Sequence, residues 1–218
     1  MNRKISLLLS LSLATALLWF AEPIRAGYKA RPWSVRPRES YPARLTSEGV
    51  TIAVEPLFSD ALAARVFDKA DVVTRGIMPL GIGIFNDNDF PIEVDGLSIE
   101  LIHDRDRTRT LMPQEVVYRL FKKDKSWLIP QIPGLSKSNL NADALEDFDH
   151  KFLMKKMVAG HGAEGAFLYL HIPESKDLRS YLSDATVYIP NIYRRDVGSR
   201  LIFFEIGLRD ALSAGPGR

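Results

Sequence analysis

The sequence predicts a mainly β fold, an antiparallel sandwich or barrel with a helical insert between an early and a late set of strands. Three observations support this prediction. Apolar residues alternate with a period of two in several short segments. Residues 113–160 lack that alternation and show helical spacing instead. No strand–helix–strand rhythm runs along the chain, which argues against a parallel α/β sheet.

The early strands are expected at residues 51–54, 77–85 and 97–101. The first two segments end at turn-forming residues, and Leu97, Ile99 and Leu101 share one face of the third. Between the first two, Ser59 can cap a short helix, because apolar residues then follow at helical spacing up to position 70. An antiparallel sheet with one buried face has this pattern.

The late strands are expected at residues 166–172, 186–189 and 200–208. In each segment, every second residue is apolar, so one face of each strand points into a core. The inward residues predicted for the first and last segments are Leu168, Leu170, Ile172, Ile202, Phe204, Ile206 and Leu208. The remaining residues, 209–218, are expected to form a flexible tail.

The insert, residues 113–160, is expected to contain two helices. Pro113 suits the first position of a helix, and apolar residues follow at helical spacing up to Phe121. Asn141 can cap the second helix, with Lys155 and Lys156 near its C-terminus, where cations are favoured. The apolar stripe of this helix is expected to contain Leu145, Phe148 and Phe152.

Residues 1–26 have the three parts of a secretory signal peptide. A basic start precedes seventeen uncharged residues, and the small residue Ala26 suits a peptidase cut directly after it. The alternative is an uncleaved anchor, because such a segment is at the lower limit for spanning a bilayer. We therefore expect a periplasmic or secreted bacterial protein. The chain has no Cys, so neither a disulfide nor a lipid anchor on Cys is available.

Removal of the signal peptide changes the charge of the chain. Arg3, Lys4, Arg25 and Glu22 leave with it, so 26 of the 29 basic and 26 of the 27 acidic residues remain. This neutral balance gives no electrostatic footprint for nucleic acid. Residues 27–49 are locally basic and rich in Pro, which predicts an extended arm before the sandwich of residues 50–208. The arm could contact an anionic surface, or it could be a solvated linker.

No motif identifies a reaction, and whether the protein is an enzyme stays open. The chain lacks a catalytic Cys, a nucleophile elbow and a phosphate-binding Gly loop, and we expect no cofactor, metal site or catalytic residue. His161 and Glu164 are too few ligands for zinc. The residues Asp104, Asp106, Thr108, Thr110 and Glu115 have calcium-loop spacing, but Arg109 replaces the Gly that such a loop needs, which favours a charged turn.

The predicted partner site lies in the connection between the two insert helices. This Pro-containing loop carries four apolar residues, Trp127, Ile129, Ile132 and Leu135. Such a loop either folds over the sandwich or presents a patch to a partner.

Several segments resemble a group of bacterial exported proteins of unknown function. They are residues 76–80 with Asn86 and Pro91, the helix start at Pro113, the strand at 165–170 and residues 203–206. The resemblance implies an immunoglobulin-like β-sandwich with a helical insert and an envelope or secreted location. It supplies no catalytic residues. The lack of a core Cys pair and of an early Trp departs from antibody-type domains.

These observations lead to an exported, non-catalytic module that binds or supports the cell envelope. Its partner is expected to be an envelope protein or polymer and not nucleic acid, with membrane contact only through an uncleaved signal peptide or the basic arm. Two alternatives stay open. One is a metal-dependent hydrolase that gathers His161, Glu164 and His103 in space, and the other is a carrier of an apolar ligand. The sequence gives no oligomeric state.

Overall fold

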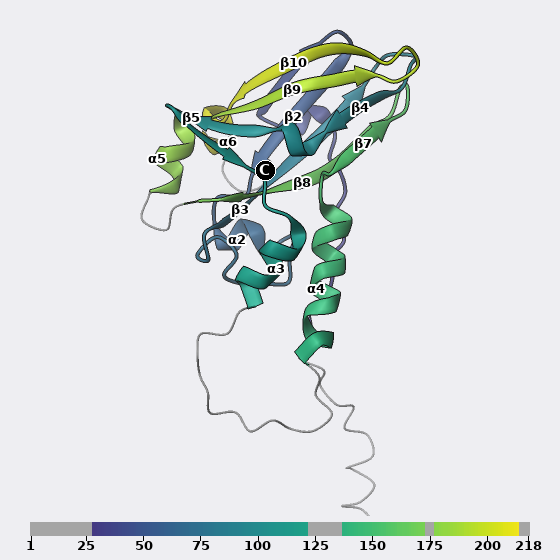
Figure 1. The fold of residues 1–218 in the computed structure, drawn as a ribbon. Helices are drawn as coiled ribbons and strands as arrows, with labels where there is room; N and C mark the ends of the chain where they lie inside the picture. The colour runs from purple at the N-terminus through teal and green to yellow at the C-terminus, as the bar shows by residue number, and fades with distance from the viewer. Residues whose placement is uncertain (1–27, 122–136, 173–176, 214–218) are drawn as a thin grey trace, which may run out of the picture.

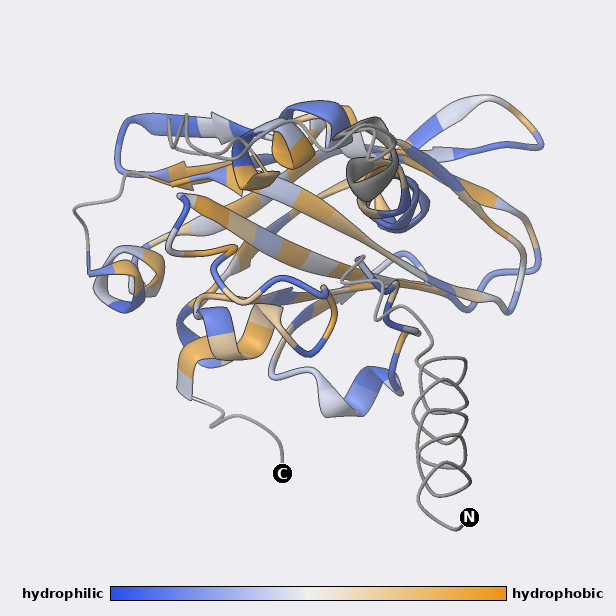
Figure 2. Cartoon of the chain, turned by 90° about the horizontal axis from the view of Figure 1, so that it is seen from below, coloured by the Kyte–Doolittle hydropathy of each residue, from blue (hydrophilic) through white to orange (hydrophobic). Residues whose placement is uncertain are grey.

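The computed structural model describes residues 28–121, 137–172 and 177–213. The chain is mainly β, with ten strands in two antiparallel sheets. The sheets lie face to face, and Figure 1 shows helices α2, α3 and α4 below the first sheet and α5 and α6 at one end. Hydrophobic residues follow the strands, whereas the connecting loops are mostly hydrophilic (Figure 2).

Sheet A has the strand order β1-β2-β3-β8, with β1 at Ala43–Ser47, β2 at Val50–Pro56, β3 at Ile77–Asn86 and β8 at Ala163–His171. All ten residues of β3 are buried. A strand that is buried on both faces has a continuous apolar sequence. This explains why neither face of β3 carries a row of polar side chains. The predicted strands at 51–54, 77–85 and 166–172 are confirmed.

Sheet B contains six strands. β10 (Ser199–Gly207) pairs along β9 (Thr186–Arg194), and β4 (Ile92–Asp95) and β5 (Glu100–His103) share the other side of β9. The short helix η2 (Gly96–Ser98) separates β4 from β5. β7 (Lys155–Val158) pairs with β4, and β6 (Asp106–Arg109) pairs with β5.

The main core fills the space between the two sheets. Six of the seven residues predicted to point inward from the late strands are buried there, including Leu168, Leu170, Phe204 and Ile206, whereas Ile202 is only partly buried. One end of this core is closed by α5 (Leu178–Ser183) and α6 (Arg209–Ser213), which bury Leu182 and Leu212. The expectation of a flexible tail from residue 209 is therefore wrong for α6, because Leu212 reaches the core.

A second core covers the outer face of sheet A. It is built by α2 (Asp60–Ala63), the turns after it, α3 (Pro113–Phe121) and α4 (Lys137–Lys151). Phe67 and Phe148 stack with ring centroids 4.5 Å apart, and Phe148 also contacts Tyr169 of β8. The predicted helical stripes are confirmed in part: Val116, Val117, Leu120 and Phe148 are buried, whereas Phe121 and Leu145 are only partly buried, and Phe152 is buried just after α4 ends.

Three predicted elements differ from the structure. The second insert helix ends at Lys151, and Lys155 and Lys156 lie in β7, where they pair with β4 rather than interact with a helix C-terminus. The strand expected at 97–101 begins only at Glu100, and Leu97 lies exposed in η2. The helix capped by Ser59 is only four residues long, although the predicted cap is present, because the Ser59 side chain accepts from the Leu62 N–H.

The N-terminal segment, residues 28–42, is not a free arm. It is followed directly by β1, and Tyr28 and Tyr41 are buried. Trp33 packs on Phe167 with ring centroids 4.6 Å apart, in the space left by Gly165, where a Cβ atom would lie 2.6 Å from the indole. This packing could not be predicted from the sequence, because it is made by single aromatic residues at irregular spacing, which show no periodic pattern.

None of the helices in the described ranges is long and apolar enough to cross a membrane.

Candidate functional site

The loop residues predicted to bind a partner, Trp127, Ile129, Ile132 and Leu135, lie outside the described residues. Their neighbours are placed: α3 ends at Phe121 and α4 begins at Lys137, both in the layer below sheet A (Figure 1). The loop around Trp127 therefore stays a predicted partner site.

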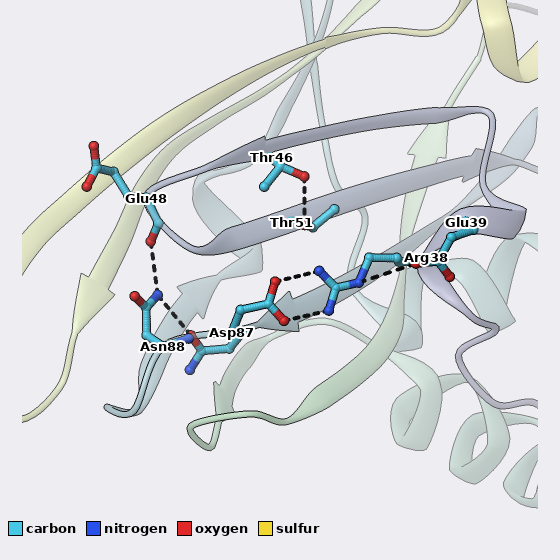
Figure 3. Close-up of polar contacts among 8 residues, drawn as sticks. Arg38, Glu39, Thr46, Glu48, Thr51, Asp87 and Asn88 are labelled. Carbon is cyan, nitrogen blue, oxygen red and sulfur yellow. Dashed lines mark hydrogen bonds and ion pairs between the residues drawn. The ribbon is translucent and has the colours of Figure 1, made fainter.

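The arginines of the N-terminal segment are neutralised within the protein. Arg31 pairs with Asp68 at 3.0 Å and Arg36 with Glu55 at 2.8 Å. Arg38 makes two parallel hydrogen bonds to the Asp87 carboxylate, as Figure 3 shows. These bonds lower the pKa of Asp87, and the Lys29 backbone N–H together with Arg31 lowers the pKa of Asp68. The basic character of this segment therefore serves internal contacts.

The loops next to Arg38 are held by side-chain amides. The Asn88 amide donates to the Glu48 carbonyl and to the Asn86 side chain, at 2.9 and 3.1 Å (Figure 3). Asn86 is buried and donates to the carbonyls of Phe90 and Ala159. The turn at residues 86–89 thus joins the β1–β2, β3–β4 and β7–β8 connections at one end of the sheets.

The histidines do not form a metal centre in the described part of the chain, where no group of three His, Asp or Glu side chains could hold an ion. His161 contacts Asp89 at 2.7 Å, and Glu164 pairs with Lys156. His103 stacks on Tyr181, with centroids 4.2 Å apart, at the opposite end of sheet B. The structure does not bring the three residues of the hydrolase alternative together. The residues with calcium-loop spacing do not form one loop: Asp104 lies in the turn before β6, Asp106 and Thr108 on β6, Thr110 in a bridge to Leu170 and Glu115 on α3.

A buried polar cluster lies under the N-terminal segment. The Asp147 carboxylate accepts from the Tyr28 hydroxyl at 2.6 Å and from Lys151 Nζ at 2.5 Å, and Lys151 also donates to the Val66 carbonyl at 3.0 Å. Burial lowers the pKa of Lys151, and burial with the Asp147 hydrogen bond raises the pKa of Tyr28. Every strong donor here has a protein acceptor, so the cluster is an anchor that joins the N-terminus to α4.

The outer face of sheet B has a different electrostatic arrangement. On β4, Ile92 and Val94 point into the core, so Glu93 points outward; on β5, Leu101 points inward and Glu100 outward. We define the outer face by the outward residues of the six strands and by Arg195, which contacts Glu93: Glu93, Asp95, Glu100, Ile102, Arg107, Arg109, Lys155, Met157, Thr186, Tyr188, Pro190, Tyr193, Arg195, Arg200, Phe203, Glu205 and Gly207.

Two cations share each buried carboxylate of this face. Arg107 and Arg109 contact Glu100 at 2.7 and 3.4 Å, and Lys155 and Arg195 contact Glu93 at 3.2 and 3.4 Å. The two carboxylate side chains are only 13% and 11% exposed, whereas the four cations are 53–80% exposed. The face therefore presents positive groups to solvent above negative groups that lie beneath them.

Aromatic and apolar side chains lie between these cations. Tyr188 and Phe203 are in contact, with ring centroids 6.3 Å apart, and Phe203 is 51% exposed. Five of the eight exposed large hydrophobic side chains in the described residues belong to sheet B, its connections or the residue before β7, and two of them, Met157 and Phe203, belong to the outer face. The five are Leu97, Met154, Met157, Val197 and Phe203.

No described helix covers this face. In Figure 1, the helices lie below sheet A or at the end of the sandwich, and sheet B forms the opposite surface. The sequence could not reveal the face, because its residues come from six strands whose register is set only by pairing. The alternation within β10 was the available signal: it predicted Phe204 and Ile206 as inward residues, which leaves Phe203 on the outer face. In β9 the period is broken, because Ile189 and Ile192 are both buried, so alternation alone does not place Tyr193 outward.

Comparisons with known proteins give only distant likenesses. No protein-family profile matches the chain, and no curated protein matches it. It is similar to the crystal structure of the YjhA protein from Bacillus subtilis, with 9% identity over 67% of this chain and 77% of that chain and a TM-score of 0.36. A functionally unknown protein from Listeria monocytogenes EGD-e shares 11% identity over 76% of each chain, with a TM-score of 0.32.

Proposed function

We propose that the protein is an exported, non-catalytic binding module of the bacterial cell envelope, and that it binds through the outer face of sheet B. The observation that carries the proposal is the exposed combination of Arg107, Arg109, Lys155 and Arg195 with the Tyr188–Phe203 pair. Arginine and aromatic side chains are enriched where proteins bind partners. Exposed apolar patches with a polar rim mark such surfaces.

The outer faces of the two sheets differ in whether other parts of the chain cover them. The outer face of sheet A is covered by the second core and by the N-terminal segment, whose arginines have carboxylate partners. That side is occupied by the chain's own residues. Sheet B carries no described helix, so its side chains can reach a partner without unfolding any element. A surface on paired strands is also more rigid than one on loops.

The finer identity of the fold and the route of export belong to the same proposal. We infer an immunoglobulin-like sandwich, because two antiparallel sheets pack face to face around one core. We infer cleavage after Ala26, because the small residue there follows an apolar segment of signal-peptide type. Periplasmic or secreted localisation follows from this cleavage. The intact mass of the mature protein should correspond to a chain that begins at Gly27. A mass that includes residues 1–26 would contradict cleavage after Ala26.

Site-specific photocrosslinking in the native host tests the proposed surface. A benzophenone amino acid replaces Phe203 in one variant and Glu146, an exposed residue of α4, in a matched control. We expect position 203 to give a defined crosslinked species in the envelope fraction that position 146 does not give. The same species from both positions, or none from position 203, would contradict binding through sheet B.

A further inference from the structure

We propose that the partner of the outer face of sheet B is an acidic polysaccharide whose carboxylates pair with Arg107, Arg109, Lys155 and Arg195 and whose sugar rings pack on Tyr188 and Phe203. This inference rests on the proposed function and deepens it by naming the chemistry of the partner.

The charge balance leaves positive groups unneutralised. Each of Glu93 and Glu100 carries one negative charge and contacts two cations. Arg200 adds a further cation, whose guanidinium donates to the Pro190 carbonyl at 2.6 Å and not to a carboxylate. Two further acids belong to the face: Glu205 on β10, and Asp95 on β4, which lies opposite Lys155 and accepts from the Leu97 N–H, so five cations face four acids. Positive groups are therefore in excess at the surface, which favours an anionic partner.

The buried carboxylates also orient the cations. Arg107 and Arg109 project from β6 and converge on the two oxygens of Glu100, so both guanidinium groups are held side by side. A guanidinium has five N–H donors, and one ion pair leaves several of them directed away from Glu100. Preorganised donors lose less entropy on binding, which strengthens their contact with a carboxylate of the partner.

The two cation groups lie apart on the sheet, with aromatic residues near them. Glu100 pairs across β5 and β9 with Tyr188, whereas Glu93 pairs across β4 and β9 with Tyr193. Tyr188 and Tyr193 are five residues apart on one strand, which corresponds to roughly 17 Å at about 3.3 Å per residue. A partner that contacts both cation groups must therefore carry negative charges at repeated positions, as a polymer does.

The aromatic residues distinguish a polysaccharide from a simple polyanion. Tyr188 and Phe203 offer flat apolar surface, and the apolar C–H faces of sugar rings can pack on it and leave water. Inorganic polyphosphate has no such faces and would use only the cations. A bilayer is flat, whereas strands in a sheet twist, so a flexible chain follows this face more closely than a membrane does.

Binding measurements with defined polymers on the full chain test the proposal. The probe is polygalacturonate, a carboxylated polysaccharide, and neutral dextran, inorganic polyphosphate and single-stranded poly-dT serve as the other arms. We expect saturable binding of polygalacturonate that weakens several-fold as NaCl rises from about 50 to about 300 mM, because salt screens exposed charges. Dextran should not bind, and polyphosphate and poly-dT should bind more weakly than polygalacturonate.

Matched charge variants locate the site. The double variant R107Q/R109Q removes two cations of the outer face, and R31Q/R36Q removes two cations that are paired in the N-terminal segment. We expect the first to weaken polygalacturonate binding at least about tenfold and the second less than about twofold, because only the first removes exposed charges in excess of carboxylate. Phe203→Ser should weaken binding about threefold or more through lost ring contact.

Three results would overturn the inference. They are the lack of saturable polygalacturonate binding, an equal loss in both double variants, and tighter binding of poly-dT or polyphosphate than of polygalacturonate. Thermal unfolding of each variant checks that the fold is intact. If polygalacturonate fails to bind but position 203 still crosslinks to one envelope component, the proposed function stands and the polysaccharide assignment falls, so the two failures are distinguishable.

Discussion

The N-terminal segment and the outer face of sheet B both gather arginines, but the two regions use them differently. In the N-terminal segment, Arg31 and Arg36 each pair with one carboxylate of the body of the protein. On sheet B, two cations share each carboxylate, and the carboxylates are nearly buried. The same residue type thus fastens one region to the fold and leaves charge exposed on the other.

The difference shows that local basic composition does not identify a binding surface. Residues 27–49 are the more basic stretch in sequence, yet the structure gives their arginines internal partners. The cations of sheet B come from β6, β7 and the residues around β9, and no single stretch of sequence concentrates them. Binding of an anionic partner depends on the ratio of cations to carboxylates on one surface of the folded protein.

The largest expected effect comes from the anchor under the N-terminal segment. Asp147→Ala leaves the Lys151 ammonium buried without its carboxylate and removes the acceptor of the Tyr28 hydroxyl. Because breaking a buried ion pair leaves an uncompensated charge, we expect a loss of about 3–5 kcal/mol in the free energy of unfolding. Urea denaturation measures it.

The double variant D147A/K151M is the control for this prediction. It removes the stranded charge and keeps an apolar chain of similar length, so it should recover much of the loss. A double variant as unstable as Asp147→Ala would assign the effect to lost packing rather than to the buried charge.

The sequence predicted those parts of the fold in which a period determines burial. β10 and the stripes of α3 and α4 were expected because each buries one row or stripe, and β3 and β8 because their apolar residues continue along the strand. β7 was missed because only Val158 of its four residues is buried, so Lys155–Val158 shows no strand pattern. Trp33 was assigned to an arm because its contact, Gly165, is more than a hundred residues away.

The candidate site was less predictable than the fold. The apolar loop around Trp127 was chosen because Trp and Ile in a Pro-containing loop are visible in a single stretch of sequence. The outer face of sheet B depends on β-pairing between residues such as Glu100 and Arg109, and between Glu100 and Tyr188. Alternation can assign each of these residues to a face, but it cannot say which strands are neighbours.

A second prediction compares glycines on the two sheets. Gly165→Val places side-chain carbon where a Cβ would already lie 2.6 Å from Trp33, so the indole must move off sheet A. We expect a loss of about 1–3 kcal/mol, because overpacking forces such shifts. A Cβ atom at Gly207 of sheet B would meet no other atom within 4 Å, and Gly207→Val should be neutral or slightly stabilising.

Thermal unfolding of the two valine variants measures this difference. A lower melting temperature for the Gly165 variant alone would support tight packing of the N-terminal segment. Equal melting temperatures would mean that Trp33 can leave sheet A without cost.

A third prediction concerns acid. Arg38 lowers the pKa of Asp87 below its usual 3.8, so the stabilisation from this pair is present above that value and is lost as pH falls through the lower folded-state pKa. Arg38→Ala should therefore lower the melting temperature slightly at pH 5, and the difference from wild type should shrink at about pH 3 or below. A difference that stays constant over this range would mean that Arg38 acts by packing on Phe85 and not by charge.

The smallest expected effect on stability is on sheet B itself. Arg109 is 80% exposed, and Arg107 remains on Glu100 when it is removed, so Arg109→Ala should change the free energy of unfolding by less than about 0.5 kcal/mol. Urea denaturation beside polygalacturonate binding separates the two roles of arginine. If the variant keeps its stability but loses affinity for polygalacturonate, Arg109 contributes to binding and not to the fold. If it loses stability and keeps its affinity, Arg109 has the same structural role as the arginines of the N-terminal segment, and the contrast between the two regions is removed.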